Sequence, residues 1–107
     1  MKIFLDDERE PVDYLDWVVV RNYAQFVGVI LTAREPITFI SFDHDLGDDS
    51  LSGYEAVKWL CDLDMQRSTK FKILGPAFKW YVHSQNPVGA ENINMYLHSY
   101  MEFAYGI

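Results

Sequence analysis

The sequence predicts an α/β fold in which helices pack on a mainly parallel sheet of about four strands. Two strand-like segments come first in the chain. After them, segments whose apolar residues are spaced as in a helix alternate with apolar runs typical of strands. The apolar runs are continuous rather than alternating with polar residues, which is typical of strands in parallel sheets. The chain has 107 residues, half of them hydrophobic, so we expect one domain that spans residues 1–107.

Four short segments have the composition of strands. Residues 2–5 (KIFL) form an apolar run that ends in acidic residues, and residues 17–21 (WVVVR) are rich in β-branched side chains. The third and fourth strands are predicted at 37–42 (ITFISF) and 77–82 (AFKWYV). Whether residues 71–74 (FKIL) form a further strand or only pack against the core is left open.

Helix-capping residues mark the start of three helices. Asn22 can cap a helix over about residues 23–34. Ser52 and Glu55 have the spacing of a capping box and open a second helix. Asn86 followed by Pro87 predicts the start of a last helix, which runs to about residue 103.

Polar residues follow three of the predicted strands. The carboxyl ends of parallel strands lie at one edge of a sheet, and ligands bind there in such folds. Each motif also has a structural explanation as a turn or a helix cap, but their occurrence after three separate strands favours a functional site. The residues are Asp6 and Asp7, then Asp43, His44 and Asp45, then residues 83–86 (HSQN).

A cluster of carboxylates predicts a bound cation. Two carboxylates 4 Å apart repel by roughly 4 kcal/mol at an effective dielectric constant of 20, so the cluster must bind a cation or take up protons. Oxygen ligands without a thiolate favour Mg²⁺, with Mn²⁺ as the alternative, and no ligand spacing specifies zinc. The expected metal ligands are Asp6, Asp7, Asp43 and Asp45.

A phosphate site is expected beside the acids. The last helix begins next to the same edge, and helix N-termini favour anions. An arginine just past the first acids can fold back onto a phosphate, and imidazole is suited to proton transfer near neutrality. The expected phosphate-binding residues are Arg9, Ser84, Asn86 and Gly89, and the expected catalytic residues are His44, His83 and Asp43.

Charge and composition exclude several classes of protein. With 16 acidic and 9 basic residues the net charge is −7, which argues against non-specific nucleic-acid binding and against docking on anionic membranes. Cys61 is the single cysteine, so an internal disulfide is excluded. The first apolar run is too short for a signal peptide, and no run approaches the ~20 residues of a membrane span. We therefore expect a cytoplasmic protein.

Four motifs resemble those of the cyclic-phosphate-processing receiver-like family. They are LDDER-x-P at 5–11, ISFDHDL at 40–46, Ser-Gly-Tyr at 52–54 and HSQNPVGA-x-N at 83–92, so the resemblance covers nearly the whole chain. It implies a receiver- or flavodoxin-like Rossmannoid sandwich of three layers. It also implies a role in processing cyclic phosphates of nucleotides or RNA, often in phage and defence contexts.

The resemblance also assigns roles to single residues. Asp6 and Asp7 look like the metal-binding acid pair of receivers, Asp43 is similar to the acid that accepts phosphate, and Ser84 resembles the hydroxyl after the fourth strand. The two histidines are not receiver features and favour acid–base chemistry over phosphorelay. The receiver's lysine after a fifth strand has no counterpart, and the chain is too short for five strand–helix units.

These observations together predict a metal-assisted hydrolase. Its substrate would be a cyclic phosphate or a related phosphodiester, such as a cyclic nucleotide or an RNA terminus. Two other functions stay open. One is a signalling receiver that accepts phosphate on Asp43, and the other is a non-catalytic module that binds a nucleotide or a partner protein.

Overall fold

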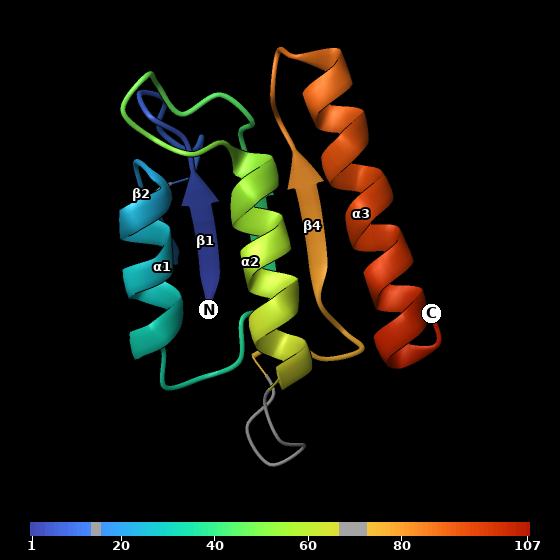
Figure 1. Cartoon of the computed structure of the whole chain (residues 1–107). Coiled ribbons are helices and arrows are strands. Elements are labelled where there is room, and N and C mark those ends of the chain that lie inside the picture. The colour runs from blue at the N-terminus through green and yellow to red at the C-terminus, as the bar shows by residue number, and fades with distance from the viewer. Residues whose placement is uncertain (14–15, 67–72) are drawn as a thin grey trace.

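The computed structural model describes residues 1–13, 16–66 and 73–107, which form one sheet covered by helices (Figure 1). All four strands are parallel, and their order across the sheet is β2-β1-β3-β4. The elements in chain order are β1 (Lys2–Leu5), β2 (Trp17–Val20), α1 (Tyr23–Thr32), β3 (Phe39–Phe42), α2 (Gly53–Gln66), β4 (Lys79–Val82) and α3 (Pro87–Tyr105).

The predicted fold class is confirmed, with a four-strand parallel sheet and three helices of the receiver or flavodoxin-like kind. Every predicted strand and helix is present, with ends that differ by up to two residues. Strand β3 begins at Phe39 because the N–H of Ile37 donates to the carbonyl of Ile73, outside the sheet. Of residues 71–74, the first two lie outside the described residues, and Leu74 packs in the core without being part of a strand.

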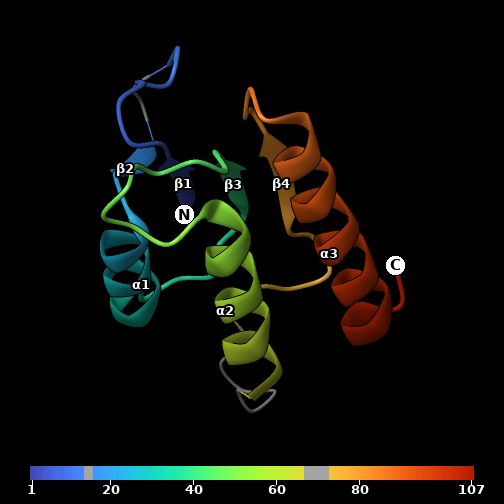
Figure 2. The same cartoon turned by 45° about the horizontal axis from the view of Figure 1, so that its top comes forward.

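The helices all cover one face of the sheet, so the described residues form two layers and not the three expected (Figure 2). The handedness of the connections explains this correction. The crossovers from β2 to β3 and from β3 to β4 run in the same direction, and right-handed crossovers then place α1 and α2 on the same face. Only the reverse connection, from β1 to β2, would place a helix on the other face, and its described residues 6–13 and 16 contain none. We call the face without helices the open face.

The hydrophobic core lies between the sheet and the helices. Side chains alternate along a strand, and those of Ile3, Leu5, Ile40 and Phe42 point toward the helices and are fully buried. Burying a side chain of this size stabilises the fold by about 1.5–3 kcal/mol. The helices add Phe26 and Ile30, Val57 and Leu60, and Ile93 and Leu97 to this core.

Among the described residues, no helix is both long enough and apolar enough to cross a membrane.

Each helix begins at a polar side chain that accepts an N–H group of its first turn, as predicted. Such caps satisfy donors that have no partner inside the helix and are typically worth ~1 kcal/mol. The pairs are Asn22 with the N–H of Gln25 at 2.8 Å, Ser52 with that of Glu55 at 3.3 Å, and Asn86 with that of Gly89 at 3.0 Å.

One carboxylate is enclosed in the core. Asp64, near the end of α2, is fully buried and accepts four hydrogen bonds. Its Oδ1 accepts the N–H groups of Ile73 at 3.1 Å and Leu74 at 2.9 Å. Its Oδ2 accepts the hydroxyls of Tyr100 at 2.6 Å and Tyr105 at 2.7 Å. Burial, and then the nearby carboxylate, raise the pKa of both tyrosines, so they stay protonated donors. Asp64 therefore links α2, the segment before β4, and α3.

Replacing Asp64 by alanine should lower the free energy of unfolding by about 3 kcal/mol or more, because four buried donors lose their acceptor. Asp64→Asn should cost less, since the amide keeps one acceptor oxygen. The exposed neighbour Asp62 on the same helix supplies the control, and Asp62→Ala should change stability by less than about 0.5 kcal/mol. Urea denaturation measures both values, and equal losses in the two alanine variants would contradict this role.

Candidate functional site

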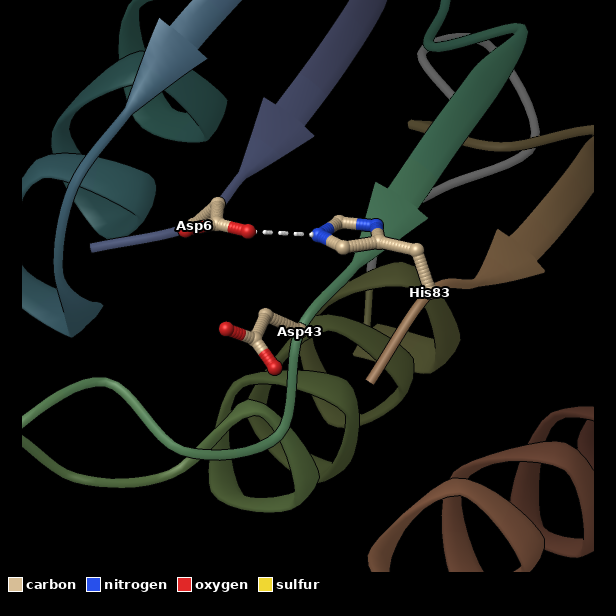
Figure 3. A group of neighbouring side chains, drawn as sticks. All are labelled: Asp6, Asp43 and His83. Carbon is tan, nitrogen blue, oxygen red and sulfur yellow. Dashed lines mark hydrogen bonds and ion pairs between the residues drawn. The ribbon is translucent and has the colours of Figure 1, made fainter. Parts of the chain in front are cut away.

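The register of the strands places three predicted site residues in one row. The last residues of β1, β3 and β4 are paired in register, and the next residues are Asp6, Asp43 and His83. The ladder continues into this row: the N–H of Asp43 donates to the carbonyl of Leu5, and that of His83 to the carbonyl of Phe42, both at 2.9 Å. Figure 3 shows Asp6 and His83 meeting beside Asp43. One ligand atom from each residue lies within 4.8 Å of the other two. We call these three residues the strand-end row.

Asp6 is a fully buried carboxylate whose two oxygens both accept hydrogen bonds. Its Oδ1 accepts the N–H groups of Glu8 at 2.9 Å and Arg9 at 2.8 Å, which closes a tight turn after β1. Its Oδ2 lies 2.9 Å from Nε2 of His83 and 2.9 Å from Nε of Arg9. Burial alone would raise the pKa of Asp6, but these bonds outweigh it, and the pKa is lowered.

His83 is held at both ring nitrogens. Its Nε2 faces the Asp6 carboxylate, so that nitrogen carries a proton. Its Nδ1 lies 2.7 Å from the hydroxyl oxygen of Ser41, which donates to the neutral ring or accepts from the charged ring. The ring also stacks on Phe4, with 4.6 Å between centroids and 5° between planes. The imidazole is therefore fixed in position on the open face.

Arg9 links the two carboxylates of the row. Its Nε lies 2.9 Å from Oδ2 of Asp6, and its Nη2 lies 3.4 Å from Oδ2 of Asp43. Burial opposes the charge of Arg9, but the two carboxylates outweigh it and raise the pKa of the guanidinium. The side chain of Arg9 is 41% exposed, so a ligand at this edge of the sheet can reach it.

The donor set of the row suits a divalent cation under one condition. Asp6 and Asp43 supply the oxygen ligands that Mg²⁺ and Mn²⁺ prefer, and such ions are commonly held by one or two carboxylates, waters and substrate phosphates. In this arrangement Nε2 of His83 donates to Asp6, so that nitrogen is not free to bind the ion. Because Arg9 now neutralises both carboxylates, the residues fit the ion when Arg9 turns away, for example onto a phosphate.

A second polar cluster lies at the N-terminus of α3. Nδ1 of His44 lies 2.8 Å from Oδ1 of Asp45, and the amide of Asn86 donates to Oδ2 of Asp45 at 3.4 Å. The bond from His44 lowers the pKa of Asp45, although partial burial opposes it. The side chain of Asp45 is 69% exposed, so this pair adds little stability. The hydroxyl of Ser84 accepts the N–H of Asn86 at 3.0 Å, which fixes the turn before the helix.

Two glycines allow backbone segments to approach this region closely. A Cβ atom at Gly53 would lie 2.0 Å from the carbonyl oxygen of Asp43, and the N–H of Gly53 donates to the carbonyl of His44 at 2.7 Å. A Cβ atom at Gly89 would lie 2.4 Å from the ring of His44. Gly89 therefore makes room for the His44 ring, and Gly53 lets α2 begin against the end of β3.

A family model for the cyclic-phosphate processing receiver domain matches residues 1–99, which include every strand and most of α3. The chain belongs to this family. No curated protein matches the chain significantly, and no solved structure does. The resemblance indicated by the four motifs is thus confirmed, and with it an association with cyclic-phosphate processing.

In this receiver-like chain most of the predicted site residues fall into two groups, and two of them lie outside both. Successive side chains of extended backbone point in opposite directions, so only one of two adjacent polar residues can face the row. The metal, phosphate and catalytic roles of all of them remain predictions. Arg9 joins Asp6, Asp43 and His83 at the row, whereas Asp7 is exposed, His44, Asp45, Asn86 and Gly89 form the second cluster, and Ser84 lies in the turn before α3.

Three residues that shape the row are absent from the sequence-based prediction. Ser41 and Phe4 lie two positions before Asp43 and Asp6, and the period of two along a strand is the signal that could have found them. Arg21 donates through Nη1 to the carbonyls of Asp6 at 3.2 Å and Arg9 at 2.6 Å, and it pairs with Glu10. No pattern in the sequence signals that contact.

In metal-free buffer, Asp6 should stabilise the fold at neutral pH and lose this effect in acid. Its folded pKa lies below the ordinary value of 3.8, so its contribution is complete above that value and is lost as the pH falls through the folded pKa. Near pH 7, Asp6→Asn should be about 2 kcal/mol less stable than the wild type, and this gap should close at acid pH. Urea denaturation from pH 2 to pH 7 measures it. The matched control Asp7→Asn should show no such gap, and a gap for Asp6→Asn that does not depend on pH would contradict the assignment.

Proposed function

We propose that the protein is a hydrolase that opens a cyclic phosphate ester or cleaves a related phosphodiester at the strand-end row. One observation carries the proposal. Two carboxylates, an imidazole and a guanidinium meet at the carboxyl ends of parallel strands in a chain of the cyclic-phosphate processing receiver family. Ligands commonly bind outside such strand ends. Cyclic nucleotides and RNA termini that carry a cyclic phosphate are the candidate substrates.

Arg9 is the residue best suited to hold the phosphate. A guanidinium presents paired N–H groups that match two phosphate oxygens, and this one reaches solvent. Turning toward a phosphate would remove the guanidinium that faces both Asp6 and Asp43, which is why a divalent cation is part of the proposal. When bound by these two carboxylates, Mg²⁺ or Mn²⁺ would supply charge neutralisation and polarisation of a phosphoryl oxygen.

Asp43 and His83 divide the proton transfers. A water oxygen attacks phosphorus and forms a new P–O bond while the bond to the ester oxygen breaks. Asp43 accepts the proton of the water. The charged ring of His83 gives its Nε2 proton to the leaving oxygen and keeps its Nδ1 proton, and the proton held by Asp43 afterwards restores the charged ring. The product is a phosphate monoester with a free hydroxyl, and one water is consumed. The hydroxyl of Ser41 holds Nδ1 during the transfer, and Asp6 orients Nε2 before its proton leaves.

The His83→Gln variant should turn over 2′,3′-cyclic or 3′,5′-cyclic nucleotides at least about a hundredfold more slowly than the wild type, because the leaving oxygen loses its proton donor. The assay supplies each cyclic nucleotide with Mg²⁺ or Mn²⁺ and follows the monophosphate by chromatography. His98 on α3 is an exposed imidazole away from the row, and His98→Gln should keep full activity. Removing the cation with EDTA should abolish turnover.

Other outcomes of the same experiments would contradict a hydrolase. If the folded wild type turns over none of these nucleotides, the protein is not the proposed hydrolase. A signalling receiver would instead gain one phosphoryl group from a small phosphodonor, and Asp43→Asn would lose it. A binding module would bind a nucleotide tightly without turnover, and His83→Ala would leave its affinity unchanged.

Ser41 should act as a positioning residue for His83. Ser41→Ala should lower kcat about tenfold with little change in KM, since the lost hydrogen bond loosens the ring and touches no substrate. Ser41→Thr keeps the hydroxyl and should restore most of kcat. ¹⁵N NMR of the His83 ring supplies a readout independent of activity, in which the alanine variant should shift the Nδ1 signal. Unchanged ring signals together with a lower kcat would exclude the positioning role.

A further inference from the structure

The open face extends the strand-end row toward the amino ends of the strands. Residues two positions before the row point to the same face, because side chains alternate along each strand. Phe4, Ser41 and Tyr81 are paired across β1, β3 and β4. Tyr81 therefore lies beside Ser41 and two residues before His83, on the face where the His83 ring stacks on Phe4.

Among the described aromatic side chains of the open face, Tyr81 is the most exposed, at 62%. Its neighbour Trp80 points the other way: the indole N–H donates to Asn94 at 3.0 Å, and the ring contacts His98 at 4.8 Å between centroids. Both partners of Trp80 lie on α3, so alternation assigns Tyr81 to the open face. An exposed ring thus adjoins the proposed active site on the same strand.

The charges of the open face complement a phosphate ester. The row nearest the amino ends pairs Lys2 with Trp17 and with Phe39, and Phe39 with Lys79. Nζ of Lys2 lies 4.5 Å from the centre of the Trp17 ring. Two lysines and several rings therefore line this face in a chain whose net charge is −7, and Arg9 lies at its carboxyl end. Cations interleaved with rings are the features that bind phosphate-linked aromatic bases.

We propose that the open face binds the planar ring of the substrate, so that a nucleobase stacks on Tyr81 while its phosphate reaches Arg9 and His83. The inference rests on the proposed function, since the phosphate is placed at the strand-end row. Positions two residues apart on a strand are about 6.6–6.8 Å apart, which one ribose can bridge. Stacking on a ring tolerates any base, so the site selects nucleotides over aliphatic phosphates and does not select among bases.

Two substrates with the same cyclic phosphate test the ring site directly. Adenosine 2′,3′-cyclic phosphate carries a base, and glycerol 1,2-cyclic phosphate does not. Tyr81→Ala should raise the KM of the adenosine substrate about tenfold and leave that of the glycerol substrate unchanged. Tyr81→Phe keeps the stacking ring and should stay near the wild type. Phe103→Ala removes an exposed ring from α3, outside the open face, and should change neither KM.

A binding measurement separates failure of this inference from failure of the proposed function. Calorimetry with adenosine 3′-monophosphate needs no turnover, and Tyr81→Ala should weaken its binding while Tyr81→Phe should not. If neither cyclic phosphate is hydrolysed but binding depends on the Tyr81 ring, the hydrolase fails and the ring site stands. If both are hydrolysed and Tyr81→Ala changes both KM values or neither, the ring site is overturned. It is also overturned if the wild type sediments as a dimer that Tyr81→Ala dissociates, because the face then joins two copies.

Discussion

The in-register pairing of β1, β3 and β4 is the constraint on which the candidate site depends. Each strand ends at the same level, so Asp6, Asp43 and His83 follow the sheet in a single row although 77 residues separate the first from the last. A slip of one residue turns a strand's side chains to the opposite face. Such a slip in β4 would place Ser84 in the row and remove the imidazole. The geometry of the candidate site is thus a consequence of backbone hydrogen bonds.

Charge compensation is the second condition for the row. If no positive charge opposed it, the repulsion between two carboxylates 4 Å apart would be roughly 4 kcal/mol. Here Arg9 faces both carboxylates, His83 donates to Asp6, and two backbone N–H groups donate to Asp6 as well. In the proposed reaction one guanidinium serves the carboxylates first and the phosphate later. Binding of the proposed cation and binding of the phosphate would therefore be coupled through Arg9.

The sequence was sufficient to predict the strands, the helix caps and the convergence of three strand ends, because apolar runs and capping residues are local signals. It could not show whether Asp6 or Asp7, and whether Asp43 or His44, faces the row. That depends on which face of the sheet the last residue of each strand points to. The role of Asp64 was also out of reach, because its partners lie 9 to 41 residues away and only the folded chain brings them together. The expected third layer was wrong for a related reason: the direction of each crossover follows from the strand order, which the sequence does not state.

The missing layer has a direct consequence for access to the row. Phe4 is already buried against the rings of Trp17 and His83. A helix between β1 and β2 would cover those rings as well, and the strand ends would then be reached only from the edge of the sheet. Without one in the described residues, the row is continuous with an aromatic surface that begins at Tyr81. Parallel sheets are usually covered on both faces, because their strands are apolar on both. On the open face of this chain, lysines lie among the aromatic rings. A face that is simply buried would not need these charged side chains. The two-layer arrangement therefore places the strand-end row and the proposed ring-binding surface on one side of the sheet.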